Sequence, residues 1–68
     1  MKKEKVGARI RALRESRGET QKDLSKVIGV TPMAISLYES GLRMPSDEIK
    51  IAIAHHYDEP IDKIFFAE

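Results

Sequence analysis

Apolar residues recur at helical spacing in five segments of the chain, and residues that favour turns separate these segments. In the first segment the apolar side chains stand at i, i+4 and i+7: Val6, Ile10 and Leu13. This spacing predicts a helix from Lys3 to about Arg17, with Gly18 ending it. Gly7 lies inside this helix and predicts either fraying of its early part or a close contact with another segment.

The most specific pattern lies between residues 21 and 40, which read as two short helices joined by a tight turn. Its apolar positions are Leu24 and Ile28 in the first helix, Val30 in the turn, and Ile35 and Tyr38 in the second helix. Ser25 is small enough to let the helices approach closely, and Gly29 can take the positive φ that reverses the chain. This is the spacing of a helix-turn-helix, which lays its second helix in the major groove of DNA.

Hydroxyl side chains mark the starts of three helices. Thr20 precedes the second helix, and Asp23, three residues later, resembles the acidic half of a capping box. Thr31 precedes Pro32, which suits the first helical position because no amide hydrogen is needed there. We expect this third helix to run to about residue 40. Ser46 caps a fourth helix after an extended connector over residues 42–45.

The last two segments complete an all-α chain. The fourth helix is predicted to end near Asp58, on these apolar positions: Ile49, Ala52, Ile53 and Tyr57. A short fifth helix is predicted to begin at Pro60 and to carry Ile61, Ile64 and Phe65. We therefore expect a single domain over residues 1–68, because 68 residues lie near the lower limit for a self-supporting core.

Net charge is only +1, but its distribution along the chain is uneven. Residues 1–43 hold ten lysines and arginines against five acidic residues, a balance of +5, and residues 44–68 hold two against six, a balance of −4. A basic half and an acidic half are typical of a domain with one face for a polyanion, although ordinary solvated charge gives the same counts. No run of residues approaches the length of a membrane span, so we expect a soluble, cytoplasmic protein without a membrane partner.

Nothing in the sequence predicts an enzyme, a metal site or a cofactor. His55 and His56 are adjacent, so on a helix they point about 100° apart and cannot form an i, i+4 metal pair. Neither has a nucleophile or paired carboxylates at catalytic spacing beside it. The chain contains no cysteine, which excludes disulfide bonds.

Several motifs resemble the lambda-repressor-like family, also called Cro/XRE-type helix-turn-helix domains, in which five helices follow one another and the second and third form the motif. The resemblance covers about residues 6–65 and is carried by QKDLS at 21–25, YESG at 38–41, RMPS at 43–46 and PIDKIF at 60–65. It implies a five-helix lambda-repressor-like fold and double-stranded DNA, an operator, as the ligand.

The resemblance also implies roles for individual residues. The family's glutamine at the position of Gln21 contacts the DNA backbone, and a side-chain amide beside a helix N-terminus suits a phosphate. Arg14 and Glu39 match a pair that ties the first helix to the third in some members. Backbone contacts are also expected from Lys22, from Ser40, and from Arg43 in the loop after the third helix.

Base reading is expected from the outer face of the third helix, and here the sequence departs from the family. The reading positions match Pro32, Met33 and Leu37, which offer only apolar contact, so Thr31 and Ser36 remain as the hydrogen-bonding readers. Three alternatives stay open. The helix reads thymine methyl groups and DNA shape, it discriminates weakly, or it grips a protein partner instead.

Relatives in the family bind two-fold symmetric operators as dimers, often through the last helix. Ile64, Phe65 and Phe66 cluster at the C-terminal end, so we expect a homodimer interface there. The leading interpretation is a sequence-specific transcriptional regulator, more specifically a repressor, that acts as a homodimer on a palindromic operator. The alternative is a protein-interaction module of the antitoxin or anti-repressor type that applies the apolar third helix to a protein surface.

Overall fold

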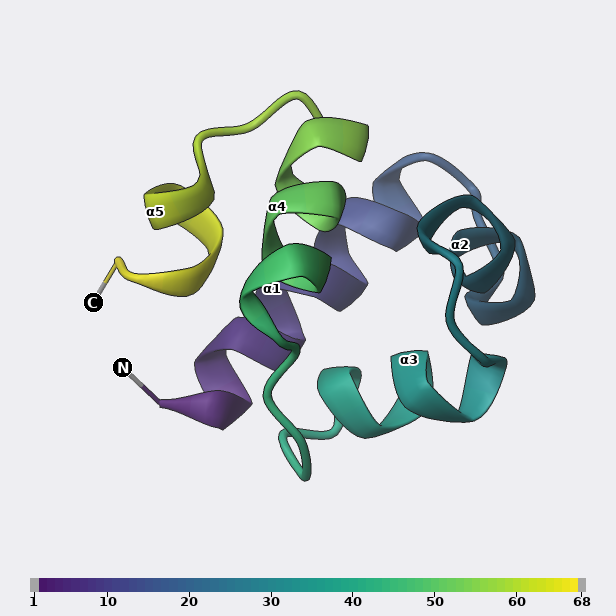
Figure 1. The fold of residues 1–68 in the computed structure, drawn as a ribbon, viewed down its shortest axis with the longest axis horizontal. Coiled ribbons are helices and arrows are strands. Elements are labelled where there is room, and N and C mark those ends of the chain that lie inside the picture. The colour runs from purple at the N-terminus through teal and green to yellow at the C-terminus, as the bar shows by residue number, and fades with distance from the viewer. Residues whose placement is uncertain (1, 68) are drawn as a thin grey trace.

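The computed structural model describes residues 2–67, and within them it contains five α-helices and no strand (Figure 1). The helices are α1 (Lys3–Ser16), α2 (Gln21–Ile28), α3 (Pro32–Glu39), α4 (Asp47–His56) and α5 (Ile61–Phe65). The all-α, five-helix prediction is confirmed. Each helix boundary lies within one or two residues of the sequence prediction, which is the usual uncertainty in where a helix frays.

The predicted start signals make the hydrogen bonds that their residue types suggest. Thr20 and Asp23 form a reciprocal capping box, in which each side chain accepts the other's backbone amide at 3.0 Å. The Thr31 hydroxyl accepts the amide of Ala34 at 3.1 Å, and the Ser46 hydroxyl caps α4 in the same way. Because these contacts span only three residues, the chain sets its helix starts locally.

The core lies where all five helices meet. α1 packs against α3 and α5, while α2 packs against α3 and α4. In Figure 1, α2 and α3 lie on one side of the molecule and α5 lies on the other. The fully buried side chains that fill the centre are Val6, Ile10, Leu24, Ile35, Ile53 and Phe65. The predicted apolar faces of the helix-turn-helix therefore point inward, and α3 keeps an outer face at the edge of the fold.

Gly7 provides a close contact between α1 and α3, which was one of its two predicted roles. A Cβ atom at this position would lie 2.4 Å from the carbonyl oxygen of Glu39 and 2.5 Å from that of Tyr38. Both atoms belong to the last turn of α3. The absence of a side chain on Gly7 thus lets the backbone of α1 approach the end of α3 directly.

Two of the three residues assigned to the dimer interface are core residues of the chain itself. Ile64 is 2% exposed and Phe65 is fully buried, because α5 closes the core against α1 and α4. The side chain of Arg9 on α1 also donates a hydrogen bond to the carbonyl of Ile64 at 3.0 Å. Of the three, only Phe66, at 51% exposure, has apolar surface to offer a partner.

Lys50 on α4 lies unexpectedly deep, at 8% exposure. Its ammonium group stands 5.3 Å from the ring centroid of Phe66 and 6.0 Å from that of Phe65, and its closest carboxylate oxygen is that of Asp47 at 3.7 Å. The aliphatic stem is covered while the charge faces aromatic rings, an arrangement typical of a buried lysine. This contact fixes the chain after α5 against α4.

Candidate nucleic-acid interface

The outer face of α3 is uncovered. Met33 is 66% exposed, Thr31 and Pro32 are also exposed, and Ser36 and Leu37 are partly exposed. The inner face of the same helix is taken by three buried residues: Ala34, Ile35 and Tyr38. The predicted base-reading residues therefore share the side of α3 that the fold leaves open.

Hydrogen-bonding groups on this face are few and partly engaged. The oxygen of Thr31 already accepts the amide of Ala34, which leaves its hydroxyl hydrogen to donate outward. Ser40 donates its hydroxyl hydrogen to the carbonyl of Leu37 at 3.1 Å, so it must release that bond before it can donate to a phosphate. Within residues 2–67, the Ser36 hydroxyl makes no hydrogen bond.

Arg14 and Glu39 form the ion pair that the family resemblance implied. Nε of Arg14 lies 2.6 Å from one carboxylate oxygen of Glu39, and Nη2 lies 3.1 Å from the other, which makes the pair bidentate. The two side chains are 11% and 5% exposed. The hydrogen bonds to Glu39 raise the pKa of the Arg14 guanidinium, and the contact holds α1 to the end of α3.

Gln21 belongs to the same polar group. Its side-chain amide donates to Glu39 at 3.1 Å, while Nη1 of Arg14 donates to the backbone carbonyl of Glu19 at 2.6 Å. The first residue of α2 is thereby tied to the end of α3, and the turn before α2 is tied to α1. One amide hydrogen of Gln21 is used inside the protein, and the second remains for a phosphate because a side-chain amide carries two.

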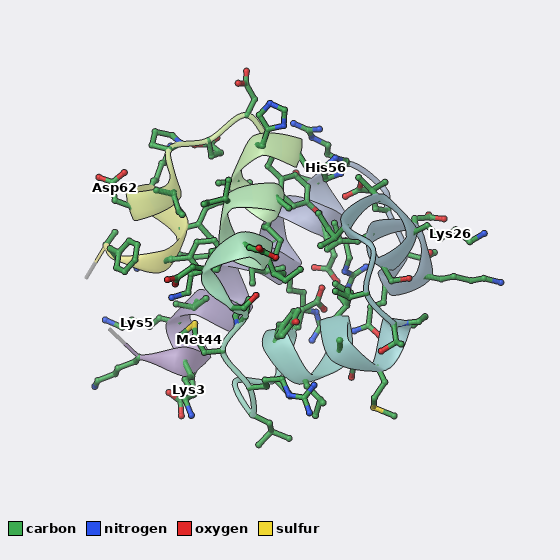
Figure 2. The ribbon with its side chains drawn as sticks, viewed as in Figure 1. Lys3, Lys5, Lys26, Met44, His56 and Asp62 are labelled. Carbon is green, nitrogen blue, oxygen red and sulfur yellow. The ribbon has the colours of Figure 1, made fainter. Side chains whose placement is uncertain are left out.

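Exposed cationic side chains lie on α2, which packs against α3, and in the loop that follows α3. They are Lys22 and Lys26 on α2 and Arg43 in the loop after α3, all exposed. The N-terminal turn of α1 adjoins that loop, because a Cβ on Gly41 would lie 3.1 Å from the Cα of Glu4. Figure 2 shows Lys26 pointing outward from α2 and Lys3 pointing outward near the loop after α3. Lys22, Lys26 and Arg43 thus belong to the elements directly before and after α3 in the chain.

A second polar cluster, not predicted from the sequence, joins the turn before α2 to the end of α4. Glu19 accepts a hydrogen bond from the Tyr57 hydroxyl at 2.7 Å and contacts Nε2 of His56 at 2.6 Å. A carboxylate only accepts, so this nitrogen of His56 carries the proton. Burial alone would raise the pKa of Glu19, but the hydrogen bonds from Tyr57 and His56 lower that pKa overall.

Arg17 completes this cluster from the end of α1. Its guanidinium stands 5.2 Å from the ring centroid of Tyr57 and donates to the backbone carbonyls of His56 and Tyr57 at 3.1 and 3.2 Å. These carbonyls lie at the C-terminal end of α4, where a cation is favourable. The cluster fixes the entry into α2. A pairing across 37 to 40 positions leaves no local signal in the sequence.

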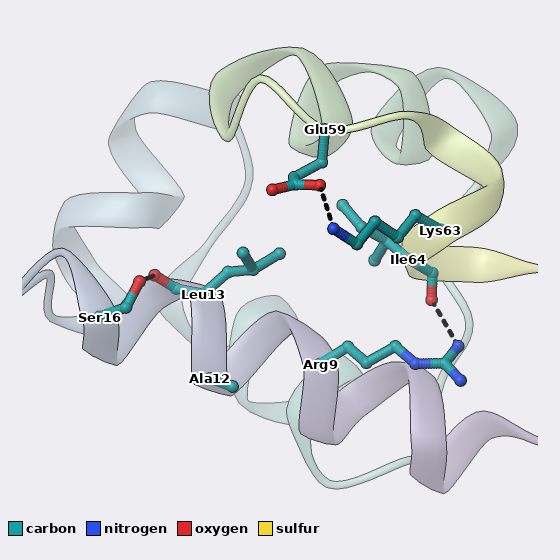
Figure 3. A pocket seen from close by; sticks show the side chains of 7 residues that line it. All are labelled: Arg9, Ala12, Leu13, Ser16, Glu59, Lys63 and Ile64. Atoms are coloured by element: carbon teal, nitrogen blue, oxygen red, sulfur yellow. Dashed lines mark hydrogen bonds and ion pairs between the residues drawn. The ribbon is translucent and has the colours of Figure 1, made fainter. Parts of the chain in front are cut away.

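A cavity of about 370 Å³ opens between α1 and the α4–α5 connection (Figure 3). Figure 3 shows Lys63 and Glu59 forming an ion pair on one side of the cavity and Arg9 reaching the carbonyl of Ile64 on another. Within the described residues, no group of histidines, cysteines and carboxylates is arranged to hold a metal ion. No helix among them is long and apolar enough to cross a membrane.

The capped α2, the glycine turn and the open face of α3 define a helix-turn-helix protein. Residues 10–64 match the helix-turn-helix family model, which covers most of the chain. The chain therefore belongs to the Cro/XRE-type helix-turn-helix family of transcriptional regulators.

Individual relatives agree with this family. A protein of Pyrococcus furiosus named as an HTH-type transcriptional regulatory protein is 35% identical over 57 residues, which is 84% of this chain and 18% of that protein. The restriction-modification controller protein C.AhdI of Aeromonas hydrophila superposes with a TM-score of 0.85 at 27% identity, over 93% of this chain and 96% of C.AhdI.

A third relative was solved with a nucleic acid. PlcR of Bacillus thuringiensis, in complex with the peptide PapR7 and DNA, superposes with a TM-score of 0.83 at 35% identity, over 96% of this chain and 24% of PlcR. The match thus covers about a quarter of PlcR and, for the Pyrococcus protein, less than a fifth of the relative's length.

Proposed function

We propose that this chain is a sequence-specific DNA-binding transcriptional regulator that inserts α3 into the major groove. The observation that carries the proposal is the open outer face of α3, with exposed cations on α2 before it and in the loop after it. A helix in the groove is flanked on both sides by phosphates, so cations are needed beside it rather than on it. PlcR, which shares this fold over most of the present chain, was solved with DNA.

The charge distribution supports this orientation. The exposed acidic residues of α4 and α5 and their connection are Asp47, Glu48, Asp58 and Asp62. Figure 2 shows Asp62 and Lys26 on opposite sides of the molecule. The only carboxylate on α3 is Glu39, and Arg14 neutralises it. A duplex that approaches α3 therefore meets two exposed lysines and one exposed carboxylate, Asp23, on α2 and Arg43 in the following loop, while four exposed carboxylates lie on the segment from α4 to α5.

The proposal also covers the oligomeric state, the regulatory role and the location of the protein. We propose a homodimer on a palindromic operator, a repressor role and a cytoplasmic location. Phe66 supports the dimer because it is half-exposed and held by Lys50, so it offers apolar area in a fixed position. Two copies of α3 about one helical turn apart on DNA would double the contact. A dimer that covers a promoter blocks polymerase without needing a further catalytic group.

Selection from a random duplex pool tests the proposal. The full chain is immobilised, bound duplexes are amplified and sequenced, and the affinity of the enriched duplex is measured across a salt series. We expect a palindromic consensus and an affinity that falls steeply with salt, with a log–log slope of about −0.9 for each phosphate neutralised. If the chain enriches no duplex, or captures a protein with salt-independent affinity, it is a protein-interaction module and the proposal fails.

A further inference from the structure

The outer face of α3 lacks every side chain that usually reads bases by paired hydrogen bonds. From Thr31 to Leu37 it contains no arginine, lysine, asparagine or glutamine. The most exposed large apolar side chain on α3 is Met33, at 66% exposure. Between the edges of the base pairs, the major groove offers one apolar feature, the C5-methyl group of thymine. The apolar outer face of α3 therefore complements the thymine methyl group in the major groove.

We propose that Met33, with Leu37 beside it, reads C5-methyl groups of pyrimidines in the major groove, and that this contact supplies most of the sequence preference. This inference rests on the proposed DNA-binding function. Met33 and Leu37 stand at i and i+4, so they share one face of α3 and lie about 6 Å apart along its axis. That separation lies between one and two base steps of about 3.4 Å, so the two side chains reach neighbouring pairs.

The chemistry of the two side chains suits methyl groups. A thioether is flexible and polarisable, so Met33 can adapt its contact to a methyl group without a fixed hydrogen-bond geometry. Leu37 is only partly exposed, which holds it in place against the fold while one edge remains open. Burying apolar surface of both partners removes it from water, and this gain does not depend on salt.

The surroundings of the apolar strip favour DNA over a protein partner as its occupant. Lys22 and Lys26 are exposed on α2, which packs against α3, and Arg43 is exposed in the loop whose backbone amide bonds the carbonyl of Leu37 at 3.2 Å. No acidic residue stands in the first turn of α3, and Glu39 at its end is paired. An apolar strip with exposed cations on the neighbouring elements complements a groove with methyl groups at its floor and phosphates at its edges.

Methyl deletion from the DNA tests the inference directly. The duplex enriched from the random pool is synthesised again with deoxyuridine in place of each thymidine in turn, which removes one methyl group and keeps base pairing. We expect a loss in affinity of about fourfold for each methyl group that α3 buries. The slope of affinity against salt should stay unchanged, because no phosphate contact is altered.

A restoration experiment separates the methyl group from the base that carries it. At each sensitive position the A·T pair is replaced by G·C, first with cytosine and then with 5-methylcytosine. We expect 5-methylcytosine to bind about fourfold more tightly than cytosine, because its methyl group occupies the same place in the groove. A helix that reads the hydrogen-bonding pattern of the base pair would not distinguish the two cytosines.

Two protein variants complete the test. Met33→Ala should bind the thymidine and deoxyuridine duplexes with affinities within a factor of two of each other at the position that Met33 reads. Ile51→Ala is the matched control, because Ile51 is an apolar side chain of similar exposure, 60%, on α4. It should keep the full penalty for deoxyuridine. Circular dichroism confirms that both variants are folded.

Two kinds of result would overturn the inference: one refutes methyl reading alone, and the other also refutes DNA binding. Salt-dependent duplex binding with no deoxyuridine penalty in the native chain, or with an equal penalty in Met33→Ala, would refute methyl reading while DNA binding stands. Failure to enrich any duplex, or salt-independent capture of a protein by the strip around Met33, would refute the DNA-binding function and the methyl inference with it.

Discussion

Replacing Gly7 by alanine sets two effects of opposite sign against each other within one helix. Alanine is the better helix former, and this effect alone would stabilise α1 by about 1 kcal/mol. The added Cβ would, however, lie 2.4 Å and 2.5 Å from two backbone oxygens of α3, where ordinary contact begins at 3.4 Å. Backbone atoms cannot rotate away. The two helices must therefore separate by about 1.0 Å, the difference between 3.4 and 2.4 Å.

The expected net effect of Gly7→Ala is destabilisation. Overpacking of a well-fitted contact costs about 1–3 kcal/mol, and the shift also strains the Arg14–Glu39 pair that joins the same helices. After the helix-propensity gain of about 1 kcal/mol, we expect a net loss of up to about 2 kcal/mol. For a domain of this size, that loss lowers the melting temperature by up to roughly 15 °C.

Thermal and urea unfolding, followed by circular dichroism, measure this loss. Ala8→Gly is the matched control, because Ala8 is the exposed neighbour on the same helix and its loss reports propensity alone, about 1 kcal/mol. If Gly7→Ala unfolds at or above the temperature of the native chain while Ala8→Gly loses stability, the direct approach of α1 to α3 is refuted.

Further changes test other parts of the structure. Glu39→Gln leaves the guanidinium of Arg14 uncompensated at 11% exposure, so urea unfolding should show a loss of about 3 kcal/mol or more, and a loss under 0.5 kcal/mol would mean that the pair does not hold α1 to α3. The folded pKa of Glu19 is lowered, so its contribution is complete above the usual value of 4.5 and disappears as pH falls through the folded pKa. The stability difference between the native chain and Glu19→Gln should accordingly shrink on acidification, and a difference that stays constant from pH 7 to pH 3 would contradict the hydrogen-bonded carboxylate. Arg43→Ala should weaken binding to all duplexes alike and reduce the salt slope by about 1, whereas an altered consensus would assign this residue to base reading. Phe66→Glu should yield a monomer in sedimentation, and an unchanged dimer would place the interface elsewhere.

Local sequence signals were enough to predict the helices and their order. Thr20, Asp23, Thr31 and Ser46 cap their helices through bonds that span three residues, and such bonds depend little on the rest of the fold. The positive φ of Gly29, 86°, likewise follows from the turn that the two helices require. The fold class could therefore be predicted from the sequence, and the family match agrees with it.

Contacts between distant segments could not be predicted in this way. The sequence left the role of Gly7 open between fraying and close contact, and gave no reason to bury Lys50 or to join Glu19 to His56. Each of these depends on how the helices pack together, which a periodic pattern does not specify. The assignment of Phe65 to a dimer interface was wrong for the same reason, because the sequence does not show whether a short terminal helix packs on its own core or on a partner's.

The methyl resonance of Met33 reports whether α3 lies in the major groove of DNA. With methionine methyl groups labelled by carbon-13, the full chain is titrated with its selected duplex and intermolecular nuclear Overhauser effects are recorded. We expect contacts from the Met33 methyl group to base protons of the major groove, stronger than any from the partly buried Met44. A Met33 signal that neither shifts nor shows a contact to DNA in the saturated complex would contradict this position of α3.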